Sequence, residues 1–315
     1  MEKKKIHIDT DLGADVDDLC AIAYLLKRHD VTVTGITTCL EERGRRTRYV
    51  KRVLELCGAP EVPVGAGEDG TLDSKELYDS AFSTEEMMFG SEIEGVSPAQ
   101  RTAGEILESS LKQGAVVAAI GPLTNIAKAA QERGYKIFNP DNLFFMGGSL
   151  WTPEKGYPAW NRENDWNINM DLAAADEVLN HCGLTMVEIA PTLKTFLTER
   201  DCARLEGTDR VNGLAARQGR FWRNHASFIR EETAKCGKLP RDLCNFHYDP
   251  LTCAIAAGFP GYQAQEEFID FCPIPEKRTY QMVRKSGGNR IRSVYDADGE
   301  AFNQTFMETM MKTLI

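Results

Sequence analysis

Short apolar runs alternate with longer amphipathic segments along the first half of the chain. Apolar runs bounded by glycine or polar residues are typical of buried strands, and an apolar period of 3.6 residues is typical of helices. By these criteria, strands are predicted at residues 5–9, 31–38, 62–67, 115–121 and 142–148. Helices are predicted at residues 16–28, 45–58, 97–114 and 123–134. Strands separated by helices of this length indicate βαβ units, and therefore an α/β fold with a mainly parallel sheet.

The pattern is less regular in the rest of the chain. A polar stretch at residues 68–97, rich in glycine and glutamate, predicts a long loop near the edge of the sheet. After residue 148 we expect a long loop at 151–169, a helix from Asp171, a strand at 184–190 and mostly helical structure to about Lys235. The C-terminal part predicts extended segments near 263–274 and 292–298, and a last helix from about Glu300.

The composition is that of a soluble globular protein. Of the 315 residues, 42% are apolar and 27% charged, and we find neither a membrane-spanning run nor a signal-peptide apolar region, so we expect no membrane partner. The net charge of −10 and the dispersed basic residues disfavour nucleic acid as a partner. The densest basic cluster, residues 43–52, falls on a predicted helix and is typical of a solvated face. Nine scattered cysteines without a CxxC pair fit a reduced, cytoplasmic protein.

Five aspartates crowd the junction between the first predicted strand and the first predicted helix: Asp9, Asp11, Asp15, Asp17 and Asp18. Carboxylates this close repel one another, so the cluster must be solvated, protonated or neutralised by a cation. Ca²⁺ and Mg²⁺ take oxygen ligands of this kind, whereas zinc would want thiolates or histidine pairs, which are missing nearby. Aspartates also favour helix N-termini, which accounts for the last three without a metal but not for Asp9 and Asp11.

Three predicted strand ends carry polar or glycine-rich segments. The aspartates follow the first strand, Ile120 and Gly121 end another, and Met146 to Gly148 end a third. Ligands of parallel sheets bind at the carboxyl ends of the strands. We therefore expect these three loops to face one crevice.

One motif in the aspartate segment suggests phosphoryl transfer. The sequence "DTDLG" at residues 9–13 resembles the DxDx(T/V) motif of haloacid-dehalogenase-type phosphatases, which would imply a metal-dependent phosphohydrolase. Leu12 and Gly13 stand where that motif wants its Thr or Val. A metal-dependent phosphohydrolase is therefore the first alternative function.

Several segments, in the right order, resemble the nucleoside hydrolase family, the inosine/uridine-preferring ribohydrolases. "DTDLGADVDD" at residues 9–18 is close to the opening DxDxGxDD signature of that family. The later segments are "GITT" (35–38), "AIGPLTNIAKA" (119–129), "FMGG" (145–148), "DWNINMDLAAA" (165–175) and "YDPLTCAIAA" (248–257). The resemblance implies one catalytic α/β domain over residues 1–315, with a mainly parallel sheet flanked by helices and a Ca²⁺ ion at the bottom of the pocket.

The resemblance also implies an activity, the hydrolysis of the N-glycosidic bond of a neutral nucleoside or related N-riboside, with a metal-bound water attacking the anomeric carbon. An acidic pocket repels phosphate, and the sequence has no glycine-rich phosphate loop, so a neutral nucleoside is favoured over a nucleotide. Family members are commonly dimers or tetramers, and by analogy we expect a homo-oligomer.

The family's functional residues can be matched to positions of this chain. The implied metal ligands are the carboxylates of Asp11, Asp18 and Asp249 and the backbone carbonyl of Ile120. Asp11 would also act as the general base. The implied substrate contacts are Asp17 and Asn167 at the ribose hydroxyls, Asp165 and Asn161 at the 5′-hydroxyl, Met146 along the sugar, and Asp249.

Three departures from the family pattern concern the sugar side of the site. The opening loop is two residues longer than usual, so Asp15 competes with Asp17 for the ribose role. After "GITT" relatives carry Gly-Asn, and Glu41 or Glu42 would replace that asparagine here. Asp165 is one methylene shorter than the family's glutamate.

The fourth departure concerns protonation of the leaving base. Tyr248 stands where many relatives have a histidine with this proposed role. The candidate acids are Tyr248, His247 and His225. Alternatively, the base leaves without an acid and is held by stacking on an aromatic ring such as Trp222 or Phe228. Loss of this step would leave a non-catalytic calcium and sugar binder, which is the second alternative.

Overall fold

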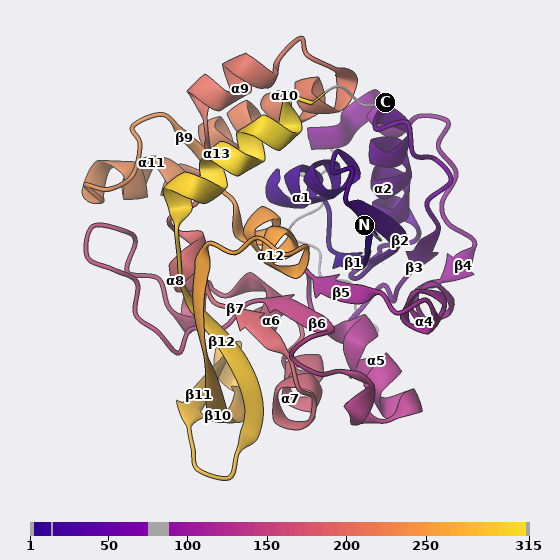
Figure 1. Cartoon of the computed structure of the whole chain (residues 1–315), viewed down its shortest axis with the longest axis vertical. Helices are drawn as coiled ribbons and strands as arrows, with labels where there is room; N and C mark the ends of the chain where they lie inside the picture. The colour runs from indigo at the N-terminus through magenta and orange to yellow at the C-terminus, as the bar shows by residue number, and fades with distance from the viewer. Residues whose placement is uncertain (1–2, 14, 75–87, 313–315) are drawn as a thin grey trace.

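The computed structural model describes residues 3–13, 15–74 and 88–312, and its centre is a ten-stranded sheet (Figure 1). The strand order is β11-β10-β12-β7-β6-β5-β1-β2-β3-β4. Neighbouring strands from β12 to β4 run parallel, and the long hairpin of β10 and β11 pairs antiparallel at the other edge. The strands are β1 (Lys4–Thr10), β2 (Val31–Thr38), β3 (Val64–Ala66), β4 (Arg101–Thr102), β5 (Val116–Ala119), β6 (Leu143–Met146), β7 (Thr185–Val187), β10 (Tyr262–Ile274), β11 (Thr279–Arg284) and β12 (Asn289–Ala297).

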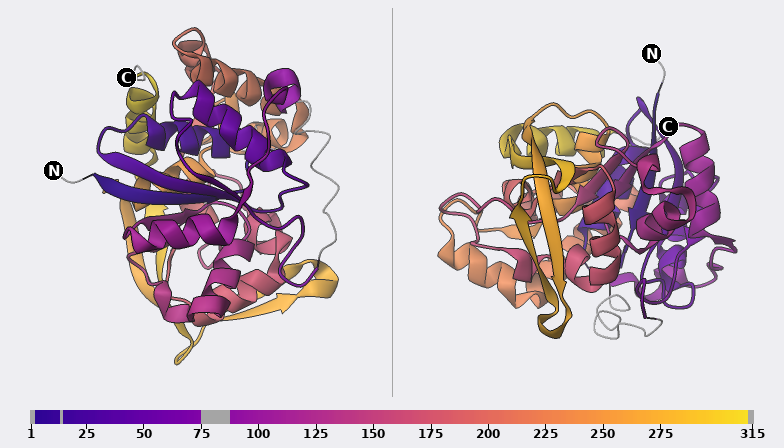
Figure 2. Two further views of the ribbon diagram at one scale, coloured as in Figure 1. Left: turned by 90° about the vertical axis from the view of Figure 1, so that its right-hand side faces the viewer. Right: turned by 90° about the horizontal axis from the view of Figure 1, so that it is seen from below.

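Helices cover both faces of the sheet, as the two views in Figure 2 show. The helices are α1 (Asp17–Leu26), α2 (Arg45–Leu56), α4 (Ala103–Lys112), α5 (Thr124–Arg133), α6 (Trp166–Met170), α7 (Leu172–His181), α8 (Ile189–Thr192), α9 (Glu199–Leu205), α10 (Arg210–His225), α11 (Ser227–Lys235), α12 (Tyr248–Ala256) and α13 (Gly299–Met310). Helices α4, α5 and α7 pack together on one face, and α1, α2 and α12 lie on the other, with α10 and α13 packed against α1. A small second sheet pairs β8 (Phe196–Thr198) with β9 (Leu243–Phe246).

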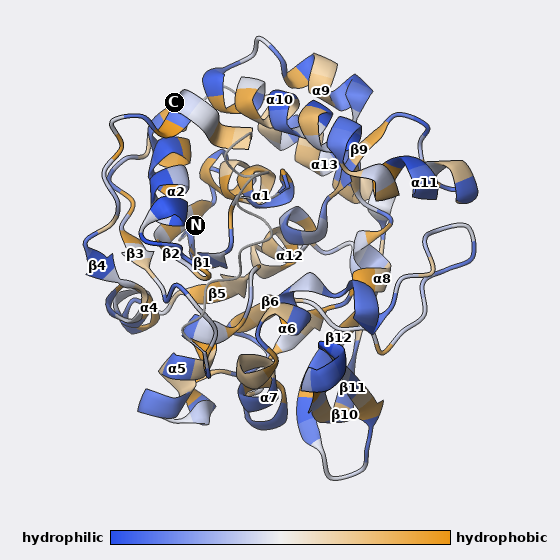
Figure 3. Ribbon diagram, turned by 180° about the vertical axis from the view of Figure 1, so that it is seen from behind, coloured by the Kyte–Doolittle hydropathy of each residue, from blue (hydrophilic) through white to orange (hydrophobic). Residues whose placement is uncertain are grey.

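The apolar character of the central strands explains why helices cover both faces. Alternate side chains of β5 point to opposite faces: Ala118 lies in the core under α1 and α12, whereas Val117 and Ala119 lie in the core under α5 and α7. Figure 3 shows the apolar colouring of these central strands and of α1. Parallel strands buried on both sides are typically continuous apolar runs, and this is the pattern from which they were predicted.

The structure confirms the α/β fold and corrects several element boundaries. The helix predicted from residue 97 begins at Ala103, because Thr102 forms a capping box with Glu105 and residues 101–102 form an edge strand. Helix α6 begins inside the predicted loop 151–169 and ends at Met170, and the strand predicted at 184–190 ends at Val187. Strand β11 was not predicted. Of the predicted loop at 68–97, residues 75–87 lie outside the described residues, and a 3₁₀ turn occupies Gly90–Ile93.

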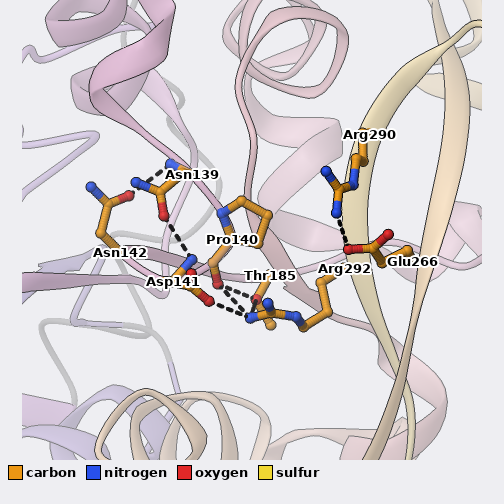
Figure 4. Close-up of polar contacts among 8 residues, drawn as sticks. All are labelled: Asn139, Pro140, Asp141, Asn142, Thr185, Glu266, Arg290 and Arg292. Carbon is orange, nitrogen blue, oxygen red and sulfur yellow. Dashed lines mark hydrogen bonds and ion pairs between the residues drawn. The ribbon is translucent and has the colours of Figure 1, made fainter.

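The turn before β6 is fixed by hydrogen bonds at the amino ends of the central strands (Figure 4). Arg292 of β12 donates from Nη1 to the Pro140 carbonyl and to Asp141 Oδ1, both at 2.9 Å. The same guanidinium reaches Thr185 Oγ1 of β7 at 3.4 Å. Arg290 forms an ion pair with Glu266 on the neighbouring strand β10. These contacts tie three strands together at their amino ends, opposite the carboxyl ends where the cavity lies.

Among the described helices, none combines the length and apolarity that a bilayer crossing requires.

Two glycines test how tightly the sheet and its helices pack. At Gly35 of β2, an added Cβ would lie 2.5 Å from Ile106 Cγ2 of α4, so Gly35→Ala should destabilise the fold by about 1–3 kcal/mol through overpacking. At exposed Gly104 of α4 an added Cβ would meet nothing within 4 Å, and Gly104→Ala should stabilise by roughly 0.5–1 kcal/mol. Urea unfolding of both variants measures the difference. Equal effects would contradict this packing.

Candidate active site

A cavity of about 470 Å³ opens at the carboxyl ends of β1, β5 and β6. Sixteen described residues line it, namely Asp11, Asp15, Asp17, Asp18, Ile120, Met146, Trp160, Asn164, Asp165, Trp166, Asn167, Ile189, Trp222, Phe228, Tyr248 and Asp249. Six of these are aspartates, and none is lysine, arginine or histidine. The three strand ends predicted to share a crevice do so.

The loop between β1 and α1 brings Asp11 into the cavity floor. The buried Arg46 of α2 donates to the Asp11 backbone carbonyl and, at 2.6 Å, to the carbonyl of Leu40. The indole N–H of Trp166 donates to Asp11 Oδ2 at 3.1 Å. Gly121 passes so close beneath that an added Cβ would lie 2.8 Å from the Asp11 nitrogen. Arg46 therefore holds the backbone of Asp11, Trp166 holds its carboxylate, and Gly121 leaves it little space to move.

The other carboxylates lie close to one another; Asp17, Asp18 and Asp249 are buried, and Asp15 is half-buried. Asp18 accepts a hydrogen bond from Thr10 Oγ1, and Asp15 Oδ2 accepts one from Asn245 Nδ2 at 3.2 Å. Asp15, Asp17 and Asp18 each offer an oxygen within 4.8 Å of the others. Burial, followed by repulsion from neighbouring carboxylates, raises the pKa of Asp17, Asp18 and Asp249 well above the usual range.

This donor set fits a hard divalent cation, because all of its side-chain donors are carboxylate oxygens. The tightest group contains Asp15 and Asp17 beside Asp18, whereas the ligands predicted from the sequence are Asp11, Asp18 and Asp249 with the carbonyl of Ile120. All of these residues line the same cavity. A bound cation would favour the ionised carboxylates and so reverse the upward pKa shifts.

Asn167 and Asp165 come from the start of α6. Asn167 Nδ2 donates to the carbonyls of Ile120 at 3.2 Å and Met146 at 3.1 Å, which joins the ends of β5 and β6. Asp165 caps α6 through the Ile168 nitrogen at 3.2 Å. Its other oxygen accepts from Gly148 N at 2.6 Å and from Tyr280 Oη of β11 at 2.9 Å. Burial raises the pKa of Asp165 to about 6, although these three donors oppose the shift.

Aromatic side chains form a wall on one side of the cavity. We call Trp160, Trp222, Phe228 and Tyr248 the aromatic wall; all four line the cavity. The Trp160 ring centroid lies 6.3 Å from that of Tyr248, with the rings 28° apart, and 5.8 Å from that of Phe228. Trp222 meets Phe228 edge-on at 6.1 Å. The four rings come from a loop and three helices and form one continuous chain of contacts.

Comparison with known proteins identifies the chain. A family model described as inosine-uridine preferring nucleoside hydrolase matches residues 6–308. The chain belongs to this family. The family resemblance inferred from the sequence segments is thereby confirmed.

Individual relatives of this nucleoside hydrolase family member are distant. A probable uridine nucleosidase 2 from Arabidopsis thaliana is 30% identical over 201 residues, which cover 60% of this chain and 59% of that relative. A solved plant nucleoside hydrolase superposes with a TM-score of 0.77 at 21% identity, covering 98% of this chain and 99% of its own. A purine-preferring ribonucleoside hydrolase from Gardnerella vaginalis gives 0.76 at 22% identity, covering 98% of both chains. The two structures confirm the predicted fold.

Two positions predicted for the sugar side, Asn161 and the glutamate pair at 41–42, are not among the described lining residues. Asn161 is exposed, accepts from the Glu163 nitrogen at 2.8 Å to cap a 3₁₀ turn, and is not among the described lining residues, whereas Asn164 is. Glu41 is buried and accepts from the nitrogen and hydroxyl of Thr47 at 2.9 and 3.0 Å. Neither Glu41 nor Glu42 lines the cavity.

The structure separates the three candidate acids of this nucleoside hydrolase family member. Tyr248 lines the cavity, and burial together with Asp15, Asp17 and Asp249 raises the pKa of its phenol well above 10. His225 is exposed and its ring stacks on Phe221 at 3.8 Å. His247 is buried against Phe306 at 4.1 Å, away from the described lining. Of the three, only Tyr248 reaches the cavity.

Sequence reasoning did not find the places of Arg46, Tyr280 and Trp160, and it grouped Asp9 with the cavity aspartates. Asp9 lies outside the described lining and accepts from Thr37 Oγ1 at 2.5 Å and Asn125 Nδ2 at 2.8 Å, which links β1 to β2 and α5. Arg46 belongs to the basic cluster predicted to be a solvated face, but only 2% of it is exposed. The other basic residues of this segment are typical of an exposed helix face. Nothing in the local sequence distinguishes the buried Arg46 from them.

Gly121 tests whether the cavity floor tolerates any displacement of Asp11. An added Cβ would lie 2.7 Å from Cys39 Sγ and 2.9 Å from Asp11 Oδ1, so Gly121→Ala must move the carboxylate. We expect Ca²⁺ affinity, measured by calorimetry, to fall by about 10- to 100-fold while the circular dichroism spectrum is retained. Gly213→Ala in α10, where nothing lies within 4 Å, is the matched control. Unchanged Ca²⁺ affinity in Gly121→Ala would contradict the assignment of Asp11.

His247 should make folding stability depend on pH. Burial lowers its pKa from 6.5 to about 3, so its contribution to stability is complete above pH 6.5 and is lost as the pH falls towards 3. Between pH 7 and pH 5, His247 should account for about 2 kcal/mol of lost stability. In His247→Phe this part of the loss should vanish, as measured by urea unfolding at both pH values. Identical pH dependence of the two proteins would refute the buried, neutral histidine.

Proposed function

We propose that this chain hydrolyses the N-glycosidic bond of a nucleoside without a phosphate group, with Ca²⁺ as its metal. The observation that carries the proposal is the set of six aspartates at one cavity in a chain of this family. Breaking an N-glycosidic bond builds positive charge on the sugar ring. Carboxylates fixed around that ring stabilise the charge as it develops.

The cation has its ligands among the cavity carboxylates. Asp11, Asp18 and Asp249, with the carbonyl of Ile120, are the proposed set, and Asp15 or Asp17 lies close enough to Asp18 to join it. Oxygen donors alone favour Ca²⁺ or Mg²⁺, and a flexible set of many carboxylates favours Ca²⁺. When bound, the ion supplies a positive centre that orients a water molecule and lowers its pKa.

The chain's own residues then divide the remaining tasks. Asp11 accepts the proton of the attacking water, with its Oδ2 held by the Trp166 indole. Asp17 binds the ribose hydroxyls together with Asn167, whose amide is held at the ends of β5 and β6. Met146 packs along the sugar, and Asp249 contacts both metal and sugar. Asp165 and Asn161 keep their proposed place near the 5′-hydroxyl, with Asn164 closer to the cavity.

Tyr248 is the proposed acid for the leaving base. Its raised pKa keeps the phenol protonated at neutral pH, which is the form that donates a proton or a hydrogen bond. Its stacking with Trp160 makes it part of the aromatic wall, which is the proposed binding surface for the base.

The acidic lining argues against the two alternatives to different degrees. A phosphohydrolase needs a cationic partner for the phosphate, and no described lining residue is lysine, arginine or histidine. A non-catalytic calcium and sugar binder would keep the same lining, so only turnover separates it from a hydrolase. A cytoplasmic location and a homo-oligomer remain part of the proposal.

Release of reducing sugar from a panel of purine and pyrimidine nucleosides tests the function. Metal-stripped protein should be inactive and should recover activity when Ca²⁺ is added. Asp11→Asn should lower kcat by at least about 100-fold, because it removes the general base. Asp141→Asn, an exposed aspartate at the opposite end of the sheet, is the matched control and should keep activity. Ca²⁺ binding without turnover of any nucleoside would overturn the hydrolase assignment, and phosphate release from ester substrates would favour the phosphohydrolase.

A further inference from the structure

We propose that the base subsite selects a leaving group with a fixed positive charge, so that the preferred substrates are cationic N-ribosides such as pyridinium ribosides. The inference rests on the proposed function for turnover, but its binding part can be tested separately. Three features of the cavity carry it: an additional carboxylate next to the aromatic wall, the wall itself, and the lack of cationic side chains among the described lining residues.

The additional carboxylate is Asp15. The loop that carries it is two residues longer than the family signature, and this places a further aspartate in the cavity beside those proposed for the metal and sugar. Asp15 Oδ2 accepts from Asn245 Nδ2 at 3.2 Å. Asn245 directly precedes Phe246, whose ring lies 5.3 Å from Trp160 and 5.5 Å from Tyr248. Asp15 lines the same cavity as the aromatic wall, and its charge raises the pKa of the Tyr248 phenol, so it adds negative charge beside the wall.

The aromatic wall offers a second attraction for a cation. Faces of tryptophan, tyrosine and phenylalanine attract positive groups, tryptophan most strongly, and the attraction grows when the site is desolvated. Two of the four wall residues are tryptophans. A neutral base gains only stacking and apolar contact from these rings, whereas a cationic base gains those and the electrostatic term as well.

The negative charge of the lining is only partly compensated, and the compensation lies at the metal end. Six aspartates line the cavity, and none of the described lining residues carries a positive charge. The buried Arg46 donates to the carbonyls of Leu40 and Asp11 beneath the floor, and its charge acts on Asp11 and Asp18, which are proposed metal ligands. A divalent ion and Arg46 therefore offset charge at that end, and a cationic base offsets charge at the wall.

The chemistry of such a substrate suits this site. Water attacks the anomeric carbon, so that a C–O bond forms as the C–N bond breaks. The electron pair of the C–N bond passes to the ring nitrogen of the leaving base. The base then departs neutral, and the proton of the water passes to Asp11. No residue has to protonate such a leaving base. The aromatic wall, whose four residues include no histidine, is therefore sufficient for its departure.

A matched pair of ligands tests the charge alone. The 1-methyl-3-carbamoylpyridinium cation and neutral 3-methylbenzamide have the same shape and differ by one ring atom and one charge. As competitive ligands of the Ca²⁺-loaded protein, the cation should bind at least about 10-fold more tightly. Equal binding, or tighter binding of the neutral compound, would overturn the inference.

Variants locate the source of the preference through the same ratio, which does not depend on turnover. Asp15→Asn and Trp160→Leu should each reduce the cation-to-neutral ratio by about 3- to 10-fold. Trp151→Leu is the matched control, because Trp151 stacks on Tyr295 at 4.7 Å outside the described lining, and its ratio should equal that of the wild type. A ratio unchanged in both Asp15→Asn and Trp160→Leu would refute the assignment.

Turnover separates this inference from the function on which it rests. Cleavage of 1-ribosyl-3-carbamoylpyridinium with a higher kcat/KM than uridine and inosine would support both. Cleavage of neutral nucleosides by a protein without cation preference would overturn the inference and leave the hydrolase function standing. Cation preference without cleavage of any riboside would support the subsite and refute the hydrolase.

Discussion

Repulsion among buried carboxylates is the constraint that the rest of this structure satisfies. Asp11, Asp17, Asp18 and Asp249 lie together at the ends of parallel strands, where burial and their neighbours raise their pKa values. Ionised groups at such a place require hydrogen-bond donors and a counter-charge. Thr10 and Trp166 supply donors, Arg46 places a positive charge beneath the floor, and a divalent ion would supply the remainder.

The sheet provides the rigidity that this arrangement needs. Asn167 joins the ends of β5 and β6, and Gly121 lets the β5 end pass directly under Asp11. Tyr280 reaches across from the edge hairpin to hold Asp165, which is 115 residues away in sequence. Segments from the whole length of the chain therefore converge on one cavity. A displacement in any of them would be transmitted to the carboxylates, because packed cores deform little.

The sequence predicted those parts of the fold and site that follow from local pattern. Strand β5 is a continuous apolar run and β2 is rich in β-branched residues, and the order of such strands with the helices indicated the α/β class and put the aspartate loop at a strand end. Strand β11 escaped prediction because an edge strand buries little of its length and its sequence, Thr279–Arg284, does not alternate clearly. Its pairing with β10 is set by the hairpin rather than by its own composition.

Residues that act through long-range contacts could not be found from the sequence. Trp160 lies in a polar loop, and Tyr280 lies on an unpredicted strand, so neither had a local signal. Arg46 was grouped with solvated basic neighbours, although its guanidinium is buried. The sequence shows that Asp165 is shorter than the family's glutamate. It does not show the three hydrogen-bond donors of Asp165, because Gly148, Ile168 and Tyr280 come together only in the folded chain.

Calorimetric titration of Ca²⁺ into metal-stripped protein, in buffers of different ionisation enthalpy, tests the central claim most directly. The account predicts one ion per chain and a net release of protons, because carboxylates with raised pKa values must lose their protons to bind the ion. Asp18→Asn, which removes one proposed ligand charge, should weaken that binding strongly and reduce the proton release. Absence of binding, or binding that Asp18→Asn leaves unchanged, would contradict a metal centre at this cluster.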